Sequence, residues 1–439
     1  MSFIRNVSVT FATKVILFLL GLVTSIVMAR IMGPEGKGLF TLAVLSAAVV
    51  YRSANLGIGS GSGYFLGRRK VPLDELAGNW LSLSILIGAS VMAVSISLAP
   101  TVAHRVLPSL SLHLVVIAML TIPFSVLHNN FQLLFKASSD FKRFNIMELA
   151  QPATFLILFV ILAVVFSDRM VDSAVVAYLV SCAFAGLLAL LLARQIASFG
   201  LRWSGELARS AVRFGVQGYL ASLLHFLNLR FDLLLVNLFL APAFVGYYSI
   251  SVMIAEKIWY VPDVLSVVLH PRVAHGSDMD ANRDTTMISR QTLLIITFCC
   301  LIILLTGRFA IRLLFSERFL PAVTPLFVLL PGVISASLSR IITSDLLARG
   351  HPRVALWAGL ASLVTNIGLN LVLIPMFGVN GAALATTVSY SMNAIVVVSA
   401  FVRIAGVSVG SVLVPRREDI SVIADRLRSA LRSRKDTDA

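Results

Sequence analysis

Nine ionisable side chains lie inside long apolar runs of this sequence, and they are the residues whose types could do chemistry there. They are Lys14, Arg52, Arg230, Asp232, Glu256, Lys257, Asp263, Arg340 and Asp345. A charged side chain inside a membrane span costs about 2.5 to 3.5 kcal/mol on insertion scales, so each is a functional candidate until a partner explains it. Five of the nine are basic. Cationic side chains in a cavity suit an anion whose polar body cannot cross hydrocarbon.

Arg52 and Lys257 are the first candidates to contact such an anion, because both lie well inside their apolar runs. The alternative is a structural ion pair, such as Lys257 with Asp232. Arg340 is also deep in its run and is a further candidate.

Lys14 and Arg230 are weaker candidates for the basic side chains that line this cavity, the cationic lumen. Lys14 could instead extend to the inner headgroups. Arg230 lies about 200 degrees from Asp232 around one helix, so it needs a partner elsewhere.

Two acids are candidates to carry a coupling ion, a proton or sodium. Asp232 shares a small and polar helix face with His225 and Asn228, at steps of three and four residues. Glu256 lies on one face of the next helix, where Ser249 and Asp263 recur every seven residues. The alternative is that both acids only neutralise lumen bases. Asp345 and Arg349, four residues apart, are expected to form a plain surface ion pair.

The sequence has no motif typical of an enzyme, a metal site or a cofactor site. The segment "GIGSGSG" (57–63) follows no strand and precedes no Gly-Lys-Ser or Gly-Lys-Thr, so it is interpreted as close helix packing. The seven histidines form no HExxH motif, and Cys182, Cys299 and Cys300 lie in apolar runs without metal-ligand spacing. We expect no catalytic residues, no metal and no cofactor.

The composition indicates a polytopic membrane protein. With 58% hydrophobic and 13% charged residues in 439, the chain has more apolar surface than one water-soluble core could bury. The formal net charge is +15, but the basic residues are scattered over short gaps between apolar runs and do not form one patch or stripe. Nucleic-acid binding is therefore not expected.

The apolar runs predict twelve transmembrane helices. They lie near 11–31, 38–58, 76–99, 112–135, 147–167, 172–196, 214–240, 243–269, 290–307, 321–347, 354–376 and 380–403. The gaps on one side hold most of the lysines and arginines, which predicts that both termini are cytoplasmic. The turn "GPEGKG" (33–38) then faces outward, and the first helix is expected to be retained rather than cleaved as a signal peptide.

An internal repeat divides the chain into two halves. At an offset of 208 residues, Pro34 and Gly38 match Pro242 and Gly246, and "VDSAVVAYLVS" (171–181) matches "VNGAALATTVS" (379–389). Six helices separate the copies, which predicts two six-helix lobes related by a pseudo-two-fold axis along the membrane normal, around a central cavity.

The predicted domains follow this repeat. They are an N-lobe of helices 1–6 at 1–200, a cytoplasmic amphipathic linker at 201–213, a C-lobe of helices 7–12 at 214–405 and a basic cytoplasmic tail at 406–439. The tail is expected to form an amphipathic helix along the inner surface, with Ile420, Ile423, Leu427 and Leu431 as its apolar stripe. We expect it to be an anchor whose deletion after Val414 leaves transport largely intact.

Three segments resemble a known family. "LGIGSGSGYFLGRR", "NLRFDLLLVNLFLAPAFVGYYSISVMIAEKIWYVPDVLSVVLHPRVA" and "LVTNIGLNLVLIPMFGVNGAALATTVSY" are similar to the lipid-linked oligosaccharide flippases, the Wzx-type polysaccharide export proteins of the multidrug/oligosaccharidyl-lipid/polysaccharide exporter superfamily. The resemblance runs from about residue 5 to residue 405. It implies a V-shaped pair of lobes, and basic lumen residues at Arg52 and Lys257.

The resemblance also implies a function: moving a polyprenyl-diphosphate-linked oligosaccharide from the inner to the outer leaflet for cell-surface polysaccharide synthesis. The expected location is the bacterial cytoplasmic membrane, and the expected functional unit is a monomer, with a polysaccharide polymerase or export complex as a candidate partner. A drug/cation antiporter of the same superfamily is an alternative that would favour an acidic lumen. A membrane glycan polymerase or ligase is the other, although the outer gaps are short for such an enzyme.

Overall fold

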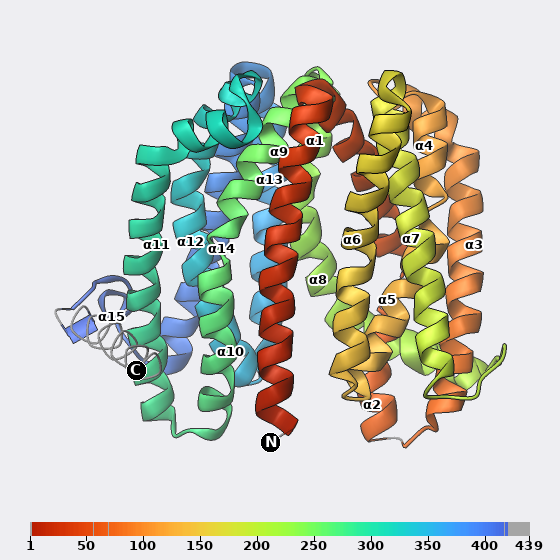
Figure 1. Ribbon diagram of the computed structural model, residues 1–439. Helices are drawn as coiled ribbons and strands as arrows, with labels where there is room; N and C mark the ends of the chain where they lie inside the picture. Colours follow the sequence, from red (N-terminus) through yellow and green to blue (C-terminus); the bar gives the residue numbers. More distant parts are fainter. Residues whose placement is uncertain (1, 56, 69, 417, 420–439) are drawn as a thin grey trace, which may run out of the picture. The chain divides into compact units, whose positions relative to one another are not determined.

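The computed structural model describes residues 2–55, 57–68, 70–416 and 418–419, and every regular element in these ranges is helical (Figure 1). The expected all-α fold class is therefore confirmed. The chain forms two compact units. Unit 1 comprises residues 1–249 and 314–319, and unit 2 comprises residues 250–313 and 320–439.

Unit 1 contains the first eight α-helices and the start of the ninth. They are α1 (Ser2–Ala54), α2 (Ser62–Gly67), α3 (Leu73–Arg105), α4 (Leu112–Met119), α5 (Ile122–Ala137), α6 (Phe141–Val165), α7 (Met170–Arg194), α8 (Gly205–Phe239) and α9 (Pro242–Lys257), with 3-10 turns at Ile58–Gly61 and Ser167–Arg169. One of its buried clusters gathers aromatic side chains from α2, α3 and α5, including Phe65, Trp80 and Phe131.

Unit 2 contains the remaining helices. They are the end of α9, α10 (Tyr260–His275), α11 (Asp278–Phe315), α12 (Val323–Ala348), α13 (Pro352–Phe377), α14 (Val379–Ala405) and α15 (Val409–Leu413), with a 3-10 turn at Glu317–Ala322. Residues 314–319, at the end of α11 and in this turn, belong to unit 1. Leu338, Ile342 and Phe401 pack in one cluster, which joins α12 to α14.

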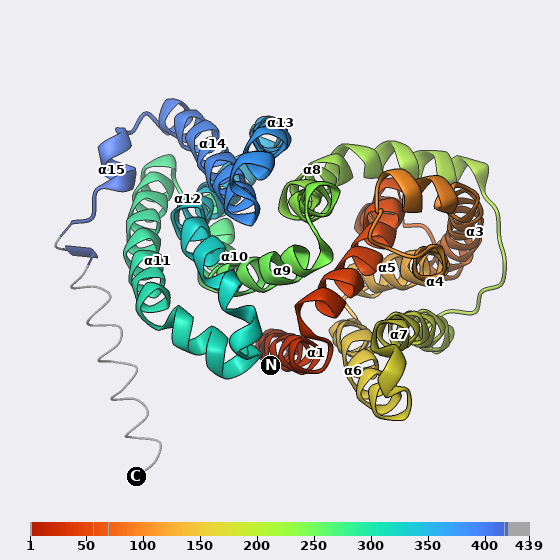
Figure 2. The same cartoon turned by 90° about the horizontal axis from the view of Figure 1, so that it is seen from above.

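Helix α1 reverses direction at the turn that contains Gly33. Gly33 has φ 68° and ψ −174°, a backbone conformation that is not helical and that favours glycine, and Pro34 follows it. At 1.5 Å per residue, a straight helix over the 46 residues Val9–Ala54 would run about 69 Å, more than twice the hydrocarbon thickness. Figures 1 and 2 show the two arms of α1 on different paths. The predicted spans 11–31 and 38–58 therefore both lie in α1.

Ten helical stretches among the described residues are long and apolar enough to cross a membrane. Val9–Ala54 counts once among them although it holds two predicted spans. The predicted span 243–269 is divided between α9 and α10, each 16 residues long. These helices support a multi-pass membrane protein, and the count of twelve transmembrane helices stays a prediction.

The repeated turns touch each other reciprocally. A Cβ atom added to Gly38 would lie 1.9 Å from the carbonyl oxygen of Pro242. One added to Gly246 would lie 2.0 Å from the carbonyl oxygen of Pro34. Glycine at both positions is therefore what allows the backbones of α1 and α9 to approach this closely.

The segment after α14 is tied to α11 by a buried ion pair. Arg290 donates from Nε and Nη2 to the Asp419 carboxylate at 2.7 and 3.0 Å, and from Nη1 to the Ser411 carbonyl at 2.6 Å. The two charged side chains are only 7% and 1% exposed. The tail's proposed stripe at Ile420, Ile423, Leu427 and Leu431 lies outside the described residues.

Candidate functional site

Arg52 lies in the last turn of α1, against two aromatic residues of α8. Its guanidinium carbon is 4.3 Å from the centre of the Phe226 ring, and its Nε donates to the Tyr51 hydroxyl at 3.2 Å. The Tyr219 hydroxyl donates to the Arg52 carbonyl at 2.8 Å and fixes the backbone there. Among the described residues no carboxylate pairs with Arg52, and its side chain is exposed. It is therefore a positioned cation available to an anionic ligand.

Lys14 has a carboxylate partner that the sequence interpretation missed. Its Nζ donates to both carboxylate oxygens of Glu148 in α6, each at 2.8 Å. Glu148 is only 14% exposed, whereas Lys14 is 48% exposed. The signal was present in the sequence: Glu148 is the second residue of the predicted span 147–167 and qualifies as an acid inside an apolar run.

Asp232 is a buried acid two turns before the end of α8. Its Oδ2 accepts a hydrogen bond from the Tyr248 hydroxyl of α9 at 2.7 Å, and its Oδ1 accepts from the Leu233 amide. One turn earlier, Asn228 is also buried, and its side-chain oxygen has no hydrogen-bond partner among the described residues. Buried polar atoms are normally paired, so this oxygen marks a place where a further donor or cation would be stabilised.

The other polar residues of this helix differ in exposure. His225 is exposed although it belongs to the same predicted face as Asn228 and Asp232. Arg230 is half-buried and donates from Nη1 to the neighbouring Leu229 carbonyl at 3.0 Å.

In unit 2, Arg340 of α12 pairs with an acid on the neighbouring helix. Its Nη1 lies 2.7 Å from the Asp263 carboxylate of α10, and its guanidinium carbon is 4.4 Å from the centre of the Trp259 ring. Arg340 is 24% exposed and Asp263 is 53% exposed. Because the Asp263 carboxylate offsets its charge, Arg340 is a weaker candidate than Arg52 to bind an anion.

Lys257 and Glu256 end helix α9. The Lys257 ammonium is 5.5 Å from the centre of the Tyr260 ring, at the start of α10. Both side chains are half-buried. Lys257 therefore combines a cation with an aromatic neighbour, as Arg52 does in unit 1.

The expectation of a plain surface pair between Asp345 and Arg349 is wrong. Asp345 is fully buried, accepts from the Thr285 hydroxyl at 2.6 Å and pairs with Arg349 Nε at 2.7 Å. Arg349 also donates to the side-chain oxygen of Asn282 at 2.8 Å. The pair joins α11 to α12. Helix spacing predicted the contact, but only the packing of α11 over it could reveal the burial.

Metal ligation finds no support in the described part of the chain. No group of three or more His, Cys, Asp or Glu side chains lies close enough to hold a metal ion there.

Comparison with known proteins places this arrangement in a family. Residues 27–324 match the family described as polysaccharide biosynthesis protein. The chain belongs to this family. The expected membership in the Wzx-type flippases of the multidrug/oligosaccharidyl-lipid/polysaccharide exporter superfamily agrees with this match.

Two curated relatives come from Haloferax volcanii. The chain is 25% identical over 193 residues to "Probable low-salt glycan biosynthesis flippase Agl15", which is 43% of this chain and 41% of the relative. It is 27% identical over 177 residues to "Probable flippase AglR", which is 38% of this chain and 37% of that relative. The chain thus spans about two fifths of the length of these relatives.

Solved structures show the same fold. The chain is similar to "Lipid II flippase MurJ, inward closed conformation", with a TM-score of 0.77 and 14% identity, over 90% of this chain and 87% of that one. It is also similar to an inward-facing multidrug resistance MATE family transporter of the MOP superfamily, with a TM-score of 0.71 and 14% identity, over 88% of this chain and 94% of that one. These identities bear on the fold of this family member and not on its substrate.

Proposed function

We propose that this family member is a flippase that moves a polyprenyl-diphosphate-linked oligosaccharide from the inner to the outer leaflet of the cytoplasmic membrane by alternating access. The proposal includes the twelve helices in two pseudo-symmetric lobes, cytoplasmic termini, a bacterial host and function as a monomer that supplies a polysaccharide polymerase or export complex. The reciprocal contact of Gly38 and Gly246 supports the symmetry, because a two-fold axis relates contacts in this way.

The observation that carries the proposal is the cation of Arg52 in an apolar span, held over Phe226 without a carboxylate partner among the described residues. A diphosphate needs such a group, since charge-assisted hydrogen bonds offset the removal of its oxygens from water. The relative named as a probable glycan biosynthesis flippase, Agl15, supports the same substrate class.

The test is leaflet translocation in proteoliposomes, with a fluorescent polyprenyl-diphosphate oligosaccharide in one arm and a cationic drug in another. We expect protein-dependent movement of the lipid-linked glycan and none of the drug. Drug movement driven by an ion gradient, with the glycan lipid left in its leaflet, would identify the antiporter of the same superfamily instead.

Arg52→Ala and Lys257→Ala are each expected to slow flipping about tenfold or more, because a hydrogen bond to a charged group contributes about 1.5 to 3 kcal/mol. Membrane insertion should stay normal. Arg353→Ala is the matched control, since this exposed arginine begins α13 outside the predicted spans. The initial rate of translocation is the measurement, and wild-type rates in both variants would remove the cationic-site proposal.

Glu256 or Asp232 is proposed to couple a counter-moving cation. When the cytoplasm is electrically negative, moving an anionic headgroup outward is favourable by about 2.3 kcal/mol per net charge per 100 mV. Export therefore needs no coupled ion, and the cation instead helps the empty carrier to return to its inward-facing state. The partnerless oxygen of Asn228 beside Asp232 supports cation binding there.

Flipping under a potential, a proton gradient or a sodium gradient, each applied alone, tests the coupling. We expect wild type to respond severalfold to the potential and to one ion gradient, and Asp232→Asn or Glu256→Gln to lose the ion response. A wild type indifferent to all three gradients would end the driving-force proposal. Variants that keep the ion response would end the assignment to these acids.

A further inference from the structure

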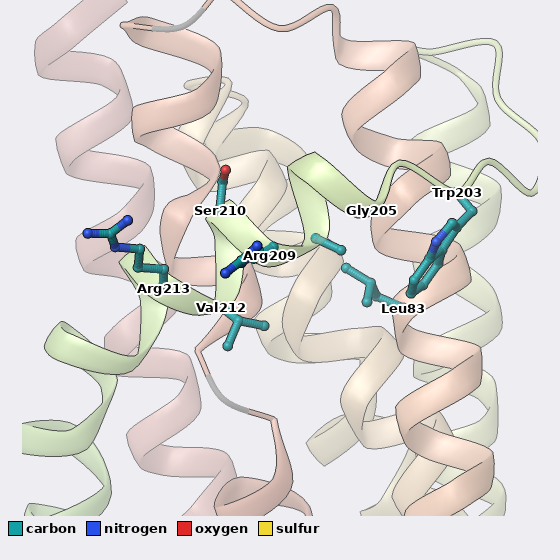
Figure 3. A pocket seen from close by; sticks show the side chains of 8 residues that line it. Leu83, Trp203, Gly205, Arg209, Ser210, Val212 and Arg213 are labelled. Carbon is teal, nitrogen blue, oxygen red and sulfur yellow. The ribbon is translucent and has the colours of Figure 1, made fainter.

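An open cavity of about 750 Å³ lies in unit 1, and neither Arg52 nor Asp232 lines it. Leu83 of α3 and residues from Trp203 to Arg213 of the linker and α8 line it (Figure 3). We call it the linker cavity. Its volume is in the range of pockets that hold drug-sized ligands.

Hydrogen bonds between α3 and the segment that joins α7 to α8 hold the wall of the linker cavity in place. The Ser198 amide donates to the Asp74 carboxylate at 2.8 Å, and Asn79 donates from its amide to the Ser204 carbonyl at 3.1 Å. The Ser204 hydroxyl accepts from the Leu207 amide and caps the start of α8. The first turns of α8 run across the bundle before the helix turns along it (Figures 1 and 2).

One end of the linker cavity is apolar, where Leu83 and Trp203 line it. Leu83 is ten residues into the span α3, which places it about 15 Å from the start of that helix. Trp203, beside it in Figure 3, is 61% exposed. Tryptophan gathers at the level of lipid headgroups because its ring is amphipathic.

The other end of the linker cavity is cationic. Arg209 and Arg213 are four residues apart on α8, and both are exposed. Among the described residues, the guanidinium groups of Arg209 and Arg213 form no ion pair and no hydrogen bond. Glu206, one turn before Arg209, pairs with neither arginine. The positive end of the α8 dipole adds to their field.

We infer that the linker cavity binds an anionic phospholipid of the surrounding bilayer. Its phosphodiester lies between Arg209 and Arg213, and an acyl chain lies along Leu83, Val212 and Trp203. A free phosphate has no acyl chain, so it would leave the apolar wall of the cavity exposed to water. A zwitterionic lipid carries a positive group, which the two arginines would repel. None of the residues proposed for transport lines this cavity, so its test measures lipid binding and does not depend on flipping.

The experiment measures lipid binding to the full-length protein in neutral detergent, by native mass spectrometry and by the thermal unfolding midpoint. Phosphatidylglycerol, phosphatidylcholine, glycerol phosphate and a polyprenyl diphosphate are titrated separately. We expect phosphatidylglycerol to bind about tenfold tighter than phosphatidylcholine and to raise the midpoint.

Arg209→Gln with Arg213→Gln should weaken phosphatidylglycerol binding about tenfold or more. Arg353→Gln with Arg403→Gln removes two exposed arginines of unit 2 and should leave binding unchanged. Val212→Trp, which fills the cavity and keeps its charge, should also prevent binding.

Four results would overturn the inference. They are equal affinity for the two phospholipids, full binding by the Arg209/Arg213 double variant, binding of glycerol phosphate as tight as that of phosphatidylglycerol, and stronger binding of the polyprenyl diphosphate than of phosphatidylglycerol. The last would make the cavity a substrate-entry site.

Discussion

Replacing Gly38 or Gly246 with alanine is expected to destabilise the protein by about 3 kcal/mol, at the upper end of the range for overpacking. The added Cβ atoms would lie 1.9 and 2.0 Å from the carbonyl oxygens of Pro242 and Pro34. The obstacle in each case is backbone, which cannot rotate away as a flexible side chain can. The helices must therefore separate, and packing around both turns is lost.

The matched control is Gly368→Ala in α13, because an added Cβ atom there meets no atom within 4 Å. This change should be neutral or slightly stabilising, since alanine favours a helix over glycine. The thermal midpoint in detergent and the monodisperse fraction on size exclusion are the measurements. If Gly38→Ala and Gly246→Ala both matched the Gly368→Ala variant, the close approach of α1 and α9 would be refuted.

Removing Asp419 is expected to destabilise unit 2 by about 3 to 5 kcal/mol, the range for breaking a buried ion pair by deleting one partner. Asp419→Ala leaves the Arg290 guanidinium, only 7% exposed, without the carboxylate that accepts two of its hydrogen bonds. Deletion after Val414 removes the same carboxylate. The earlier expectation that this truncation leaves transport largely intact should therefore fail through lost stability.

A double variant separates the ion pair from other effects of the tail. Arg290→Met with Asp419→Leu removes both charges together, so it should recover most of the stability that Asp419→Ala loses. Chemical or thermal unfolding of wild type, Arg290→Met, Asp419→Leu and the double variant completes the cycle. A coupling below about 0.5 kcal/mol would show that the pair does not hold the segment after α14.

The same pair predicts how stability depends on pH. Burial opposes ionisation of Asp419, but hydrogen bonds from Arg290 and the Arg416 amide outweigh it and lower the pKa of the carboxyl. Because the folded pKa is depressed, the pair stabilises fully above the unfolded value of about 3.9 and is lost as pH falls through the lower folded value. The gap in thermal midpoint between wild type and Asp419→Ala should thus persist at pH 5 to 7 and close in stronger acid.

The sequence alone was enough to predict that this protein lies in a membrane and to which family it belongs. Apolar runs long enough to span hydrocarbon can hardly be buried any other way, so composition predicted a helical membrane protein. The offset between Pro34 and Pro242 predicted a repeat, and the quoted segments indicated the flippase family. Insertion cost also singled out Arg52 and Asp232, and both side chains make specific contacts in the structure.

Only the tertiary structure decided which of those charges have partners. Helix periodicity gives the face of a residue but not the neighbour on that face, so Lys14 with Glu148 and Arg340 with Asp263 required the packing of separate helices. Burial has the same origin: Asp345 and Arg349 are four apart in any helix, but α11 must cover them before the pair is buried. The linker cavity likewise exists only because α3 meets the start of α8, contacts between residues more than a hundred positions apart.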